Sequence, residues 1–380
     1  MNNFLVYFFV VFGLVAIIII LYDIFIAFSK WFARIHIGQW VSDDEWKKSV
    51  DRVINHWLLH VPIVQRQDRD RLLLFDRIFK RNRSSDIQYW QLAGLLLGCN
   101  DENSINSLLS SLFNDHGSWR RKPNSVEIGL LSYAVLCHVS PVSVKVSMDE
   151  TFSYIVELKG VNDTIPYKKG QFDTRFVDTL GFVCPFLAKY AVAYECLEAA
   201  QLAKRVFFDY DSYCLANWGF PSHAYSISLK APLGIYDWGR GLGWYIIALI
   251  CLYKETDKKD PSKLEFSNRI IRLADNVLLC QHDDGGFGSQ LFIKGRPSEG
   301  SSTVLCGLLI NEAYNITKDS RYQESLNRLL VRLKKMTQRN GKLDFCQGDT
   351  KAIGSYSAQL GYLPFAQGML GMLLNNTNNI

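Results

Sequence analysis

Apolar residues recur every three or four positions through most of this chain, and this spacing is typical of amphipathic helices. The sequence predicts such helices near residues 46–60, 69–80, 86–98, 103–113, 125–138, 176–194, 196–207, 240–255, 265–280, 302–315, 321–336 and 363–375. The alternation of apolar and polar residues that marks β-strands is almost absent. Two Ser-x-x-Glu sequences, Ser42–Glu45 and Ser147–Glu150, have the form of capping boxes and predict helix starts. We therefore expect an all-α fold.

The predicted helix starts also recur at a regular distance. They fall near Ser125, Val177, Gly239, Ser301 and Leu363, with separations of 52, 62, 62 and 62 residues. A repeat of this length with two helices per unit predicts stacked helical hairpins. Because a closed ring buries small, glycine-rich helices inside it, we expect a toroid of about six hairpins. Its site should lie at the rim where the inner helices begin.

The N-terminus carries the longest apolar run. Residues 4–22 contain no charge and would span roughly 28 Å as a helix, close to the thickness of a hydrocarbon core. No basic residue precedes the run, which favours an uncleaved anchor over a cleaved signal peptide. We expect residues 4–28 to contact the bilayer, as in a single-pass inner-membrane protein. Several basic residues follow the span, namely Lys30, Arg34, Lys47, Lys48 and Arg52. This bias predicts an N-terminus outside and a cytoplasmic body, with an extracytoplasmic body as the alternative.

Cysteine content and charge narrow the function classes. The nine cysteines are scattered through apolar helical runs without Cys-x-x-Cys spacing, so we expect buried, reduced thiols and no metal site. His56 and His60 lie one helical turn apart but lack a carboxylate partner for a metal site. We interpret them as part of the solvent-exposed face of a juxtamembrane helix. The net charge of +5 is concentrated near the apolar run and does not predict nucleic-acid binding. The glycines of 239–243 follow no strand, so we expect no nucleotide and no other cofactor.

The segment 236–245 carries the clearest chemical signal. Trp238 and Trp244 bracket Arg240, which lies between glycines at the start of an apolar run. Arginine can bind a carboxylate with two parallel hydrogen bonds, and indoles offer a flat apolar face to a sugar ring. These residues favour a site for an acidic sugar at the mouth of a helix. The alternative is an aromatic loop packed on its own helix, with Arg240 in a surface ion pair with Asp237.

Four motifs, taken together, resemble those of the unsaturated glucuronyl and rhamnogalacturonyl hydrolases, glycoside hydrolase families 88 and 105. The resemblance extends over residues 85–375. The motifs are Trp238–Tyr245 (W-G-R-G-N-G-W in the family, with Leu242 here replacing Asn), Val177–Ala191 (D-T-L-F-M-x-x-P-F-L-A-x-Y), Glu299–Thr303 (E-S-S-G-T) and Ser222–Ala224, which lies where the family has a substrate-facing histidine. The resemblance implies an (α/α)6 barrel, a six-hairpin glycosidase fold. The expected organisation is a transmembrane anchor at 1–29, a juxtamembrane helical segment at 30–84 that forms the first hairpin, and the barrel at 85–380.

The resemblance also implies a reaction and roles for individual residues. The family's substrates carry a 4,5-double bond in a terminal uronic acid, which the enzyme protonates and hydrates. Asp178 matches the acid/base position, although an aspartate here could merely cap a helix. Arg240 would pair with the carboxylate and the two tryptophans would stack on the ring. His223, otherwise an ordinary polar loop residue, and Ser301 are further expected substrate contacts.

One departure concerns the second acidic residue. The family has an aspartate in a D-D-I-x-P-G-like segment, where residues 124–129 read Asn-Ser-Val-Glu-Ile-Gly. Only Glu127 could supply the second catalytic carboxylate. Either it does so from a shifted position, or the hydration reaction was lost while sugar binding remained.

The sequence therefore predicts a membrane-anchored glycoside hydrolase-like protein that acts on an acidic oligo- or polysaccharide with an unsaturated uronic acid. The alternative is a non-degradative component of cell-surface polysaccharide biosynthesis that binds or trims a nascent glycan in the same cleft. A sugar epimerase with the same toroid is disfavoured by the sparse histidines. The sugar, its linkage and the oligomeric state stay open.

Overall fold

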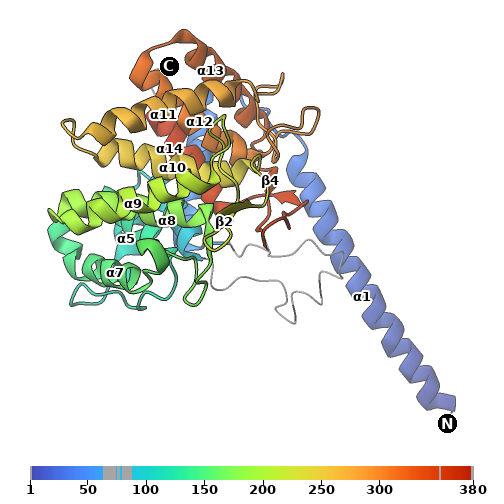
Figure 1. Cartoon of the computed structure of the whole chain (residues 1–380). Coiled ribbons are helices and arrows are strands. Elements are labelled where there is room, and N and C mark those ends of the chain that lie inside the picture. Colours follow the sequence, from blue (N-terminus) through green and yellow to red (C-terminus); the bar gives the residue numbers. More distant parts are fainter. Residues whose placement is uncertain (1, 63–73, 75–77, 79–87, 351, 378–380) are drawn as a thin grey trace.

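The computed structural model describes residues 2–62, 74, 78, 88–350 and 352–377 (Figure 1). Its long helices are α1 (Asn2–Arg34), α2 (Asp43–Leu59), α4 (Gln88–Gly98), α5 (Glu102–Leu112), α6 (Ile128–His138), α7 (Lys145–Glu157), α8 (Val177–Ala193), α9 (Leu197–Cys214), α10 (Gly239–Glu255), α11 (Pro261–Leu278), α12 (Gly300–Thr317), α13 (Ser320–Lys335) and α14 (Pro364–Asn376). The helix expected at 69–80 falls almost wholly outside the described residues. The other expected helices are present, most within a few residues of the expected bounds.

Six helices form a closed inner ring. α4, α6, α8, α10, α12 and α14 each pack against the next, and α14 returns to α4. The outer helices α5, α7, α9, α11 and α13 follow the inner ones along the chain, so inner and outer helices alternate. This arrangement confirms the all-α, six-hairpin barrel.

Small residues allow the ring to close. A Cβ atom on Gly98 would lie 2.0 Å from the carbonyl oxygen of Gly368, and one on Gly368 would lie 1.9 Å from that of Gly94. α4 and α14 can therefore approach only because these positions carry no side chain. Outer helices bury one face alone, as α13 does with Tyr322, Leu326, Leu329 and Leu333, spaced three or four residues apart.

The sixth hairpin joins the two ends of the barrel, because α2 packs against α14 and α4. The helix start at Ser42 is confirmed: the Ser42 hydroxyl accepts a hydrogen bond from the Glu45 amide at 3.1 Å. The Glu45 carboxylate accepts from the Val41 amide at 2.9 Å, one residue before the position that a capping box requires. On the same helix the Trp46 indole donates to Thr337 at 3.0 Å. The domain boundary drawn at residue 85 stays a prediction.

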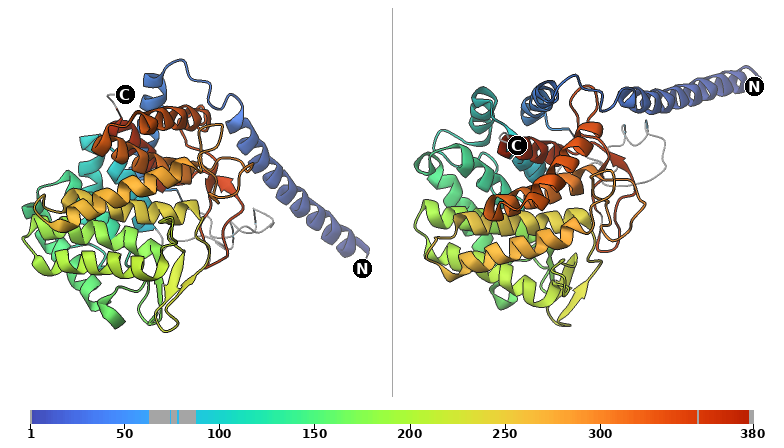
Figure 2. Two further views of the ribbon diagram at one scale, coloured as in Figure 1. Left: turned by 45° about the horizontal axis from the view of Figure 1, so that its top comes forward. Right: turned by 90° about the horizontal axis from the view of Figure 1, so that it is seen from above.

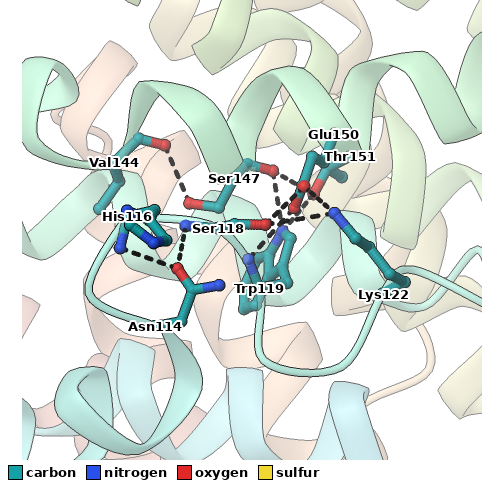
Figure 3. A network of polar contacts seen from close by, with 9 residues as sticks. All are labelled: Asn114, His116, Ser118, Trp119, Lys122, Val144, Ser147, Glu150 and Thr151. Carbon is teal, nitrogen blue, oxygen red and sulfur yellow. Dashed lines mark hydrogen bonds and ion pairs between the residues drawn. The ribbon is translucent and has the colours of Figure 1, made fainter.

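The second expected capping box is wrong. α7 begins at Lys145, directly after a 3₁₀ turn at Pro141–Val144, so Ser147 lies inside the helix and its hydroxyl donates to Val144 O at 2.9 Å. The proline starts the helical turn earlier than the Ser-x-x-Glu pattern suggests. Glu150 instead accepts hydrogen bonds from the neighbouring loop, at Ser118, Trp119 and Lys122 (Figure 3).

Short strands decorate the rim where inner helices begin. β1 (Thr174–Phe176), β2 (Ala224–Ser226) and β3 (Ala231–Leu233) form an antiparallel sheet in that order, and β4 (Cys346–Gln347) pairs with β5 (Leu360–Gly361). β1 runs directly into α8 and the chain from β3 leads into α10. β4 and β5 lie between α13 and α14. Strands of two or three residues are too short to show alternation in the sequence.

α1 extends away from the barrel with its apolar side chains exposed (Figures 1 and 2). Among the described residues, α1 is the one helix that is both long enough and apolar enough to cross a membrane. The nine cysteines are all free thiols. Seven are buried, as expected, but Cys137 is exposed and Cys196 is half-buried.

Candidate active site

Most of the sequence-predicted site residues gather at one rim of the barrel because they lie at or near the N-terminus of an inner helix. Glu127 directly precedes α6, Asp178 is the second residue of α8, and Arg240 is the second residue of α10. Ser301 occupies the equivalent position of α12. The ring thus brings together residues that are far apart in the sequence.

Asp178 provides a carboxyl group with a strongly raised pKa at this rim. The residue that caps α8 is Phe176, so the interpretation of Asp178 as a mere helix cap is wrong. Its side chain is 21% exposed, and its Oδ2 has no hydrogen-bond partner among the described residues. Burial raises the pKa of Asp178 to about 7, although the positive charge of Arg240 lowers it. Burial therefore outweighs both this charge and the helix dipole, and the carboxyl keeps its proton near neutrality.

His223 is brought to Asp178 by strand pairing. Phe176 of β1 pairs with Ala224 of β2, and the Val177 amide donates to His223 O at 2.9 Å. The imidazole Nε2 then lies 3.6 Å from Asp178 Oδ2. Burial, together with the smaller effect of the Arg240 charge, lowers the pKa of His223 to about 4, so the ring is neutral at pH 7.

Aromatic rings surround this histidine. The centroid of His223 lies 4.5 Å from Trp238 and 5.8 Å from Phe176, and Trp238 lies 5.1 Å from Tyr356. The Tyr356 hydroxyl is 3.0 Å from His223 Nδ1. If this hydroxyl donates to Nδ1, the ring proton is on Nε2, which faces Asp178. The rim therefore combines apolar ring faces with a carboxyl group, as saccharide sites do.

The ring of Trp244, which lies close to Asp178, is covered by other aromatic side chains. It is 2% exposed, and its ring packs against Phe182 at 4.8 Å, Phe365 at 4.7 Å and Trp90 at 5.6 Å. The protein itself thus takes up most of its surface. The stacking of Trp244 on a sugar stays a prediction.

Arg240 is held inside the protein. It is 2% exposed, and its guanidinium donates to Gln347 O at 2.6 Å, to Gly348 O at 2.8 Å and to Thr350 Oγ1 at 3.1 Å. It forms no ion pair with Asp237 or any other described residue, so the surface ion pair considered above is not found. Its binding to a uronate stays a prediction. Its present contacts fix the chain after β4 and place a positive charge near Asp178 and His223.

Glu127 contacts Tyr167, a residue that Asp178 also influences. It is 3% exposed, and its Oε1 accepts a hydrogen bond from the Tyr167 hydroxyl at 2.7 Å. Burial raises the pKa of Tyr167 well above its ordinary value, and the charges of Glu127, Asp178 and Asp349 raise it further. Glu127 and Asp178 therefore act on the same tyrosine from α6 and α8. The role of Glu127 in catalysis stays a prediction.

Ser301 belongs to a hydrogen-bonded cluster at the start of α12. It is fully buried, and both its amide and its hydroxyl donate to Glu299 Oε1, at 2.9 and 2.6 Å. The same oxygen accepts from the Gln347 amide at 2.6 Å, so Glu299 caps α12 and also holds β4. Contact between Ser301 and a sugar stays a prediction.

Several residues of this site were missed from the sequence. They are Tyr167, Gln347, Asp349 and Tyr356, all in irregular segments or very short strands. No periodic pattern marks such positions, and Tyr356 meets His223 across more than 130 residues of chain. The described residues contain no group of three or more His, Cys, Asp or Glu side chains arranged to hold a metal ion.

The comparisons with known proteins agree with this geometry. A family model described as Glycosyl Hydrolase Family 88 matches residues 102–353. The structure of a possible GH105 family member from Salmonella enterica serovar Paratyphi A is 15% identical, with 89% of this chain and 94% of that chain covered and a TM-score of 0.73. The unsaturated glucuronyl hydrolase of Bacillus sp. GL1, responsible for glycosaminoglycan degradation, is 11% identical, with coverage of 87% and 96% and a TM-score of 0.61.

An unsaturated glucuronyl hydrolase specific for heparin is 14% identical, with coverage of 88% and 97% and a TM-score of 0.62. No curated protein matches the chain. At these identities the solved structures establish the fold alone. The family match extends over about two thirds of the sequence, so the resemblance is confirmed: the chain belongs to glycosyl hydrolase family 88, a family of glycoside hydrolases.

Proposed function

We propose that this protein hydrates the 4,5-double bond of an unsaturated uronic acid at the end of an acidic saccharide, with Asp178 as the acid/base. The observation that carries the proposal is the largely buried carboxyl group of Asp178, with a pKa raised to about 7. A general acid works best when its pKa lies near the working pH. The similar unsaturated glucuronyl hydrolases support the substrate class.

In the proposed reaction, Asp178 donates its proton to C4 of the double bond. A water molecule then bonds through its oxygen to C5, and the carboxylate of Asp178 takes up the released proton. The product carries a hydroxyl group and the ring oxygen on C5, so it is a hemiketal that opens and releases the rest of the saccharide. One alkene and one water are consumed, and the enzyme returns to its starting protonation state.

The neighbouring residues have separate roles. Neutral His223, 3.6 Å from Asp178, can hydrogen-bond the reacting water or a sugar hydroxyl without taking the catalytic proton. Tyr356 is half-buried and offers a ring face to the sugar. Trp238 is 2% exposed and packs against Tyr356 and His223, so its stacking on a sugar stays a prediction. Arg240 supplies positive charge for the uronate, and Glu127, which accepts a hydrogen bond from Tyr167, supplies the second carboxyl group.

We propose further that α1 anchors the enzyme in the inner membrane with the barrel in the cytoplasm. The exposed apolar surface of α1 supports the anchor, and the basic residues that follow its apolar run support the orientation. Reporter fusions at the C-terminus test it: fluorescence of a cytoplasmic reporter is expected, and activity of a reporter that needs export would contradict the orientation. The comparisons give no support to a role in polysaccharide biosynthesis, and no contact in the structure favours it.

The experiment that tests the reaction follows loss of the ultraviolet absorbance of Δ4,5-unsaturated uronyl disaccharides. The wild-type chain should consume such a disaccharide, and Asp178→Asn should lower kcat by about a hundredfold or more. Asp275→Asn on the outer helix α11 makes the same chemical change away from the rim and should keep full activity. Unchanged absorbance across glucuronyl disaccharides of several linkages would refute the proposed reaction.

A further inference from the structure

The last residue of α1 is bound to the barrel. Arg34 donates from Nε to Asp344 Oδ2 at 2.8 Å and from Nη2 to Asp344 Oδ1 at 2.9 Å, which is a bidentate ion pair. The same Nη2 donates to Leu360 O at 3.3 Å, and the guanidinium lies 4.7 Å from the centre of the Phe345 ring. A helix that merely trailed from the protein would make no such set of contacts.

The partner carboxylate is deeply placed. Asp344 is 1% exposed and also accepts hydrogen bonds from Gln338 at 2.7 Å and from the Phe345 amide at 2.7 Å. Burial opposes its ionisation, but the hydrogen bonds from Arg34 and Gln338 leave the pKa of Asp344 lowered overall. Loss of Arg34 would therefore leave a buried carboxylate without its cation, which is a costly arrangement.

Asp344 and Leu360 lie at the two ends of one structural unit. We call it the rim hairpin and define it as residues 344–350 and 352–361, which include β4 and β5. Between these ends, the side-chain oxygen of Gln347 accepts a hydrogen bond from the Trp238 indole at 2.9 Å, and its backbone oxygen accepts one from Arg240. Tyr356, further along the hairpin, contacts His223. Arg34 thus links the two ends of the rim hairpin, Asp344 and Leu360, and this hairpin forms one wall of the site.

The chain after α1 is docked as well. The Gly38 amide donates to Thr337 O at 3.0 Å, and Gly38 has a φ of +72°. A Cβ atom at this position would lie 2.6 Å from Lys335 Cα. The backbone therefore packs directly on the end of α13. Figure 1 shows β4 on the side of the barrel from which α1 leaves.

We propose that Arg34 is a positioning residue of the active site, through which the apolar helix α1 holds the rim hairpin against Trp238, Arg240 and His223. The anchor and one wall of the site are then a single unit, and removal of α1 as a leader would remove Arg34 from it. The kinetic consequence rests on the proposed function, whereas the structural consequence does not.

The test compares Arg34→Gln and Arg34→Lys in the full-length chain, in detergent or nanodiscs. Hydrogen–deuterium exchange should quicken in peptides of the rim hairpin in Arg34→Gln and should be partly restored in Arg34→Lys. In the disaccharide assay, KM should rise about three- to tenfold while kcat changes less than about twofold, because Asp178 lies on α8 and not on the hairpin. Arg321→Gln, which breaks exposed ion pairs with Asp319 and Asp275, is the matched control and should change neither readout.

Exchange of the rim hairpin that is unchanged in Arg34→Gln would overturn the proposal. If that variant does not fold, Arg34→Lys decides, since it keeps the charge but loses the bidentate geometry. If the wild-type chain turns over no disaccharide, the proposed function fails. The hydrogen–deuterium exchange of the rim hairpin then decides by itself whether Arg34 positions the hairpin. A fall in kcat as large as the rise in KM would show that Arg34 does not act through the hairpin.

Discussion

The raised pKa of Asp178 predicts that this residue destabilises the folded protein at neutral pH. Folding moves its pKa from an ordinary value of 3.8 to about 7. The folded state therefore holds a proton that the unfolded chain has already released, and stability falls as the pH rises between these two values. Below pH 4 the effect vanishes, and above pH 7 it levels off at about 4 kcal/mol, the equivalent of about three pKa units.

The perturbation is Asp178→Asn, which resembles the protonated acid in size and cannot ionise. At pH 5 and pH 8 the same linkage gives wild-type penalties that differ by about 2.5 kcal/mol. The variant should therefore be more stable than the wild type, and its advantage should grow by about that amount between the two pH values. Partial exposure of the side chain, 21%, makes this figure an upper value.

Denaturant unfolding of both proteins at several pH values measures the difference, in which the titration of most other groups cancels. Asp275→Asn serves again as the control and should show a nearly constant offset from the wild type. A difference between wild type and Asp178→Asn that is independent of pH from 5 to 8 would refute the reasoning. It would mean that Asp178 has an ordinary pKa and is a poor candidate for a general acid.

Three further outcomes are expected. The kcat/KM for an unsaturated disaccharide should be level below pH 7 and fall about tenfold per unit above it, as Asp178 loses its proton; a rise across this range would contradict its role as the acid. Tyr167→Phe removes the donor to buried Glu127 and should lower the free energy of unfolding by about 1–3 kcal/mol, and an unchanged denaturation midpoint would argue against that hydrogen bond. Gly239→Ala places a Cβ atom 2.2 Å from a serine hydroxyl oxygen and should cost about 1–3 kcal/mol by thermal unfolding, whereas Gly361→Ala, with nothing within 4 Å, should be tolerated.

The fold could be predicted from the sequence because its signals are local and repeated. Helical spacing predicted nearly every described helix, and the recurrence of helix starts predicted the ring. The errors have local causes: at Ser147–Glu150 a preceding proline turn began the helix earlier, and the strands of the rim are too short to alternate. The pairing of α2 with α14 could not be predicted from spacing, since it joins opposite ends of the chain.

The site was predictable only in part, for a related reason. The resemblance identified residues at helix starts, and the ring does bring Glu127, Asp178 and Arg240 to one rim. It could not predict that Arg240 and Ser301 would form internal hydrogen bonds. The partners of Arg240 lie in and just after the two-residue strand β4, more than 100 residues away, and the partner of Ser301 is the cap of its own helix. The structure also clarifies the position where the family has a second aspartate and this chain has Glu127. Tyr167 donates a hydrogen bond to Glu127 and is also influenced by the charge of Asp178, so it links the two acidic residues.

Burial of this rim has a consequence that neither residue of the Asp178–His223 pair would show alone. In water a carboxyl group loses its proton well below the pH at which an imidazole does, so an exposed pair at pH 5–6 is an ion pair with the proton on histidine. Here the pKa of Asp178 is raised to about 7 and that of His223 is lowered to about 4, so the order is inverted. At pH 5–6 both side chains are neutral and the proton resides on the carboxyl group. Protonation of an alkene needs the proton on the group that faces the carbon, so the low polarity of the rim selects which residue is the acid.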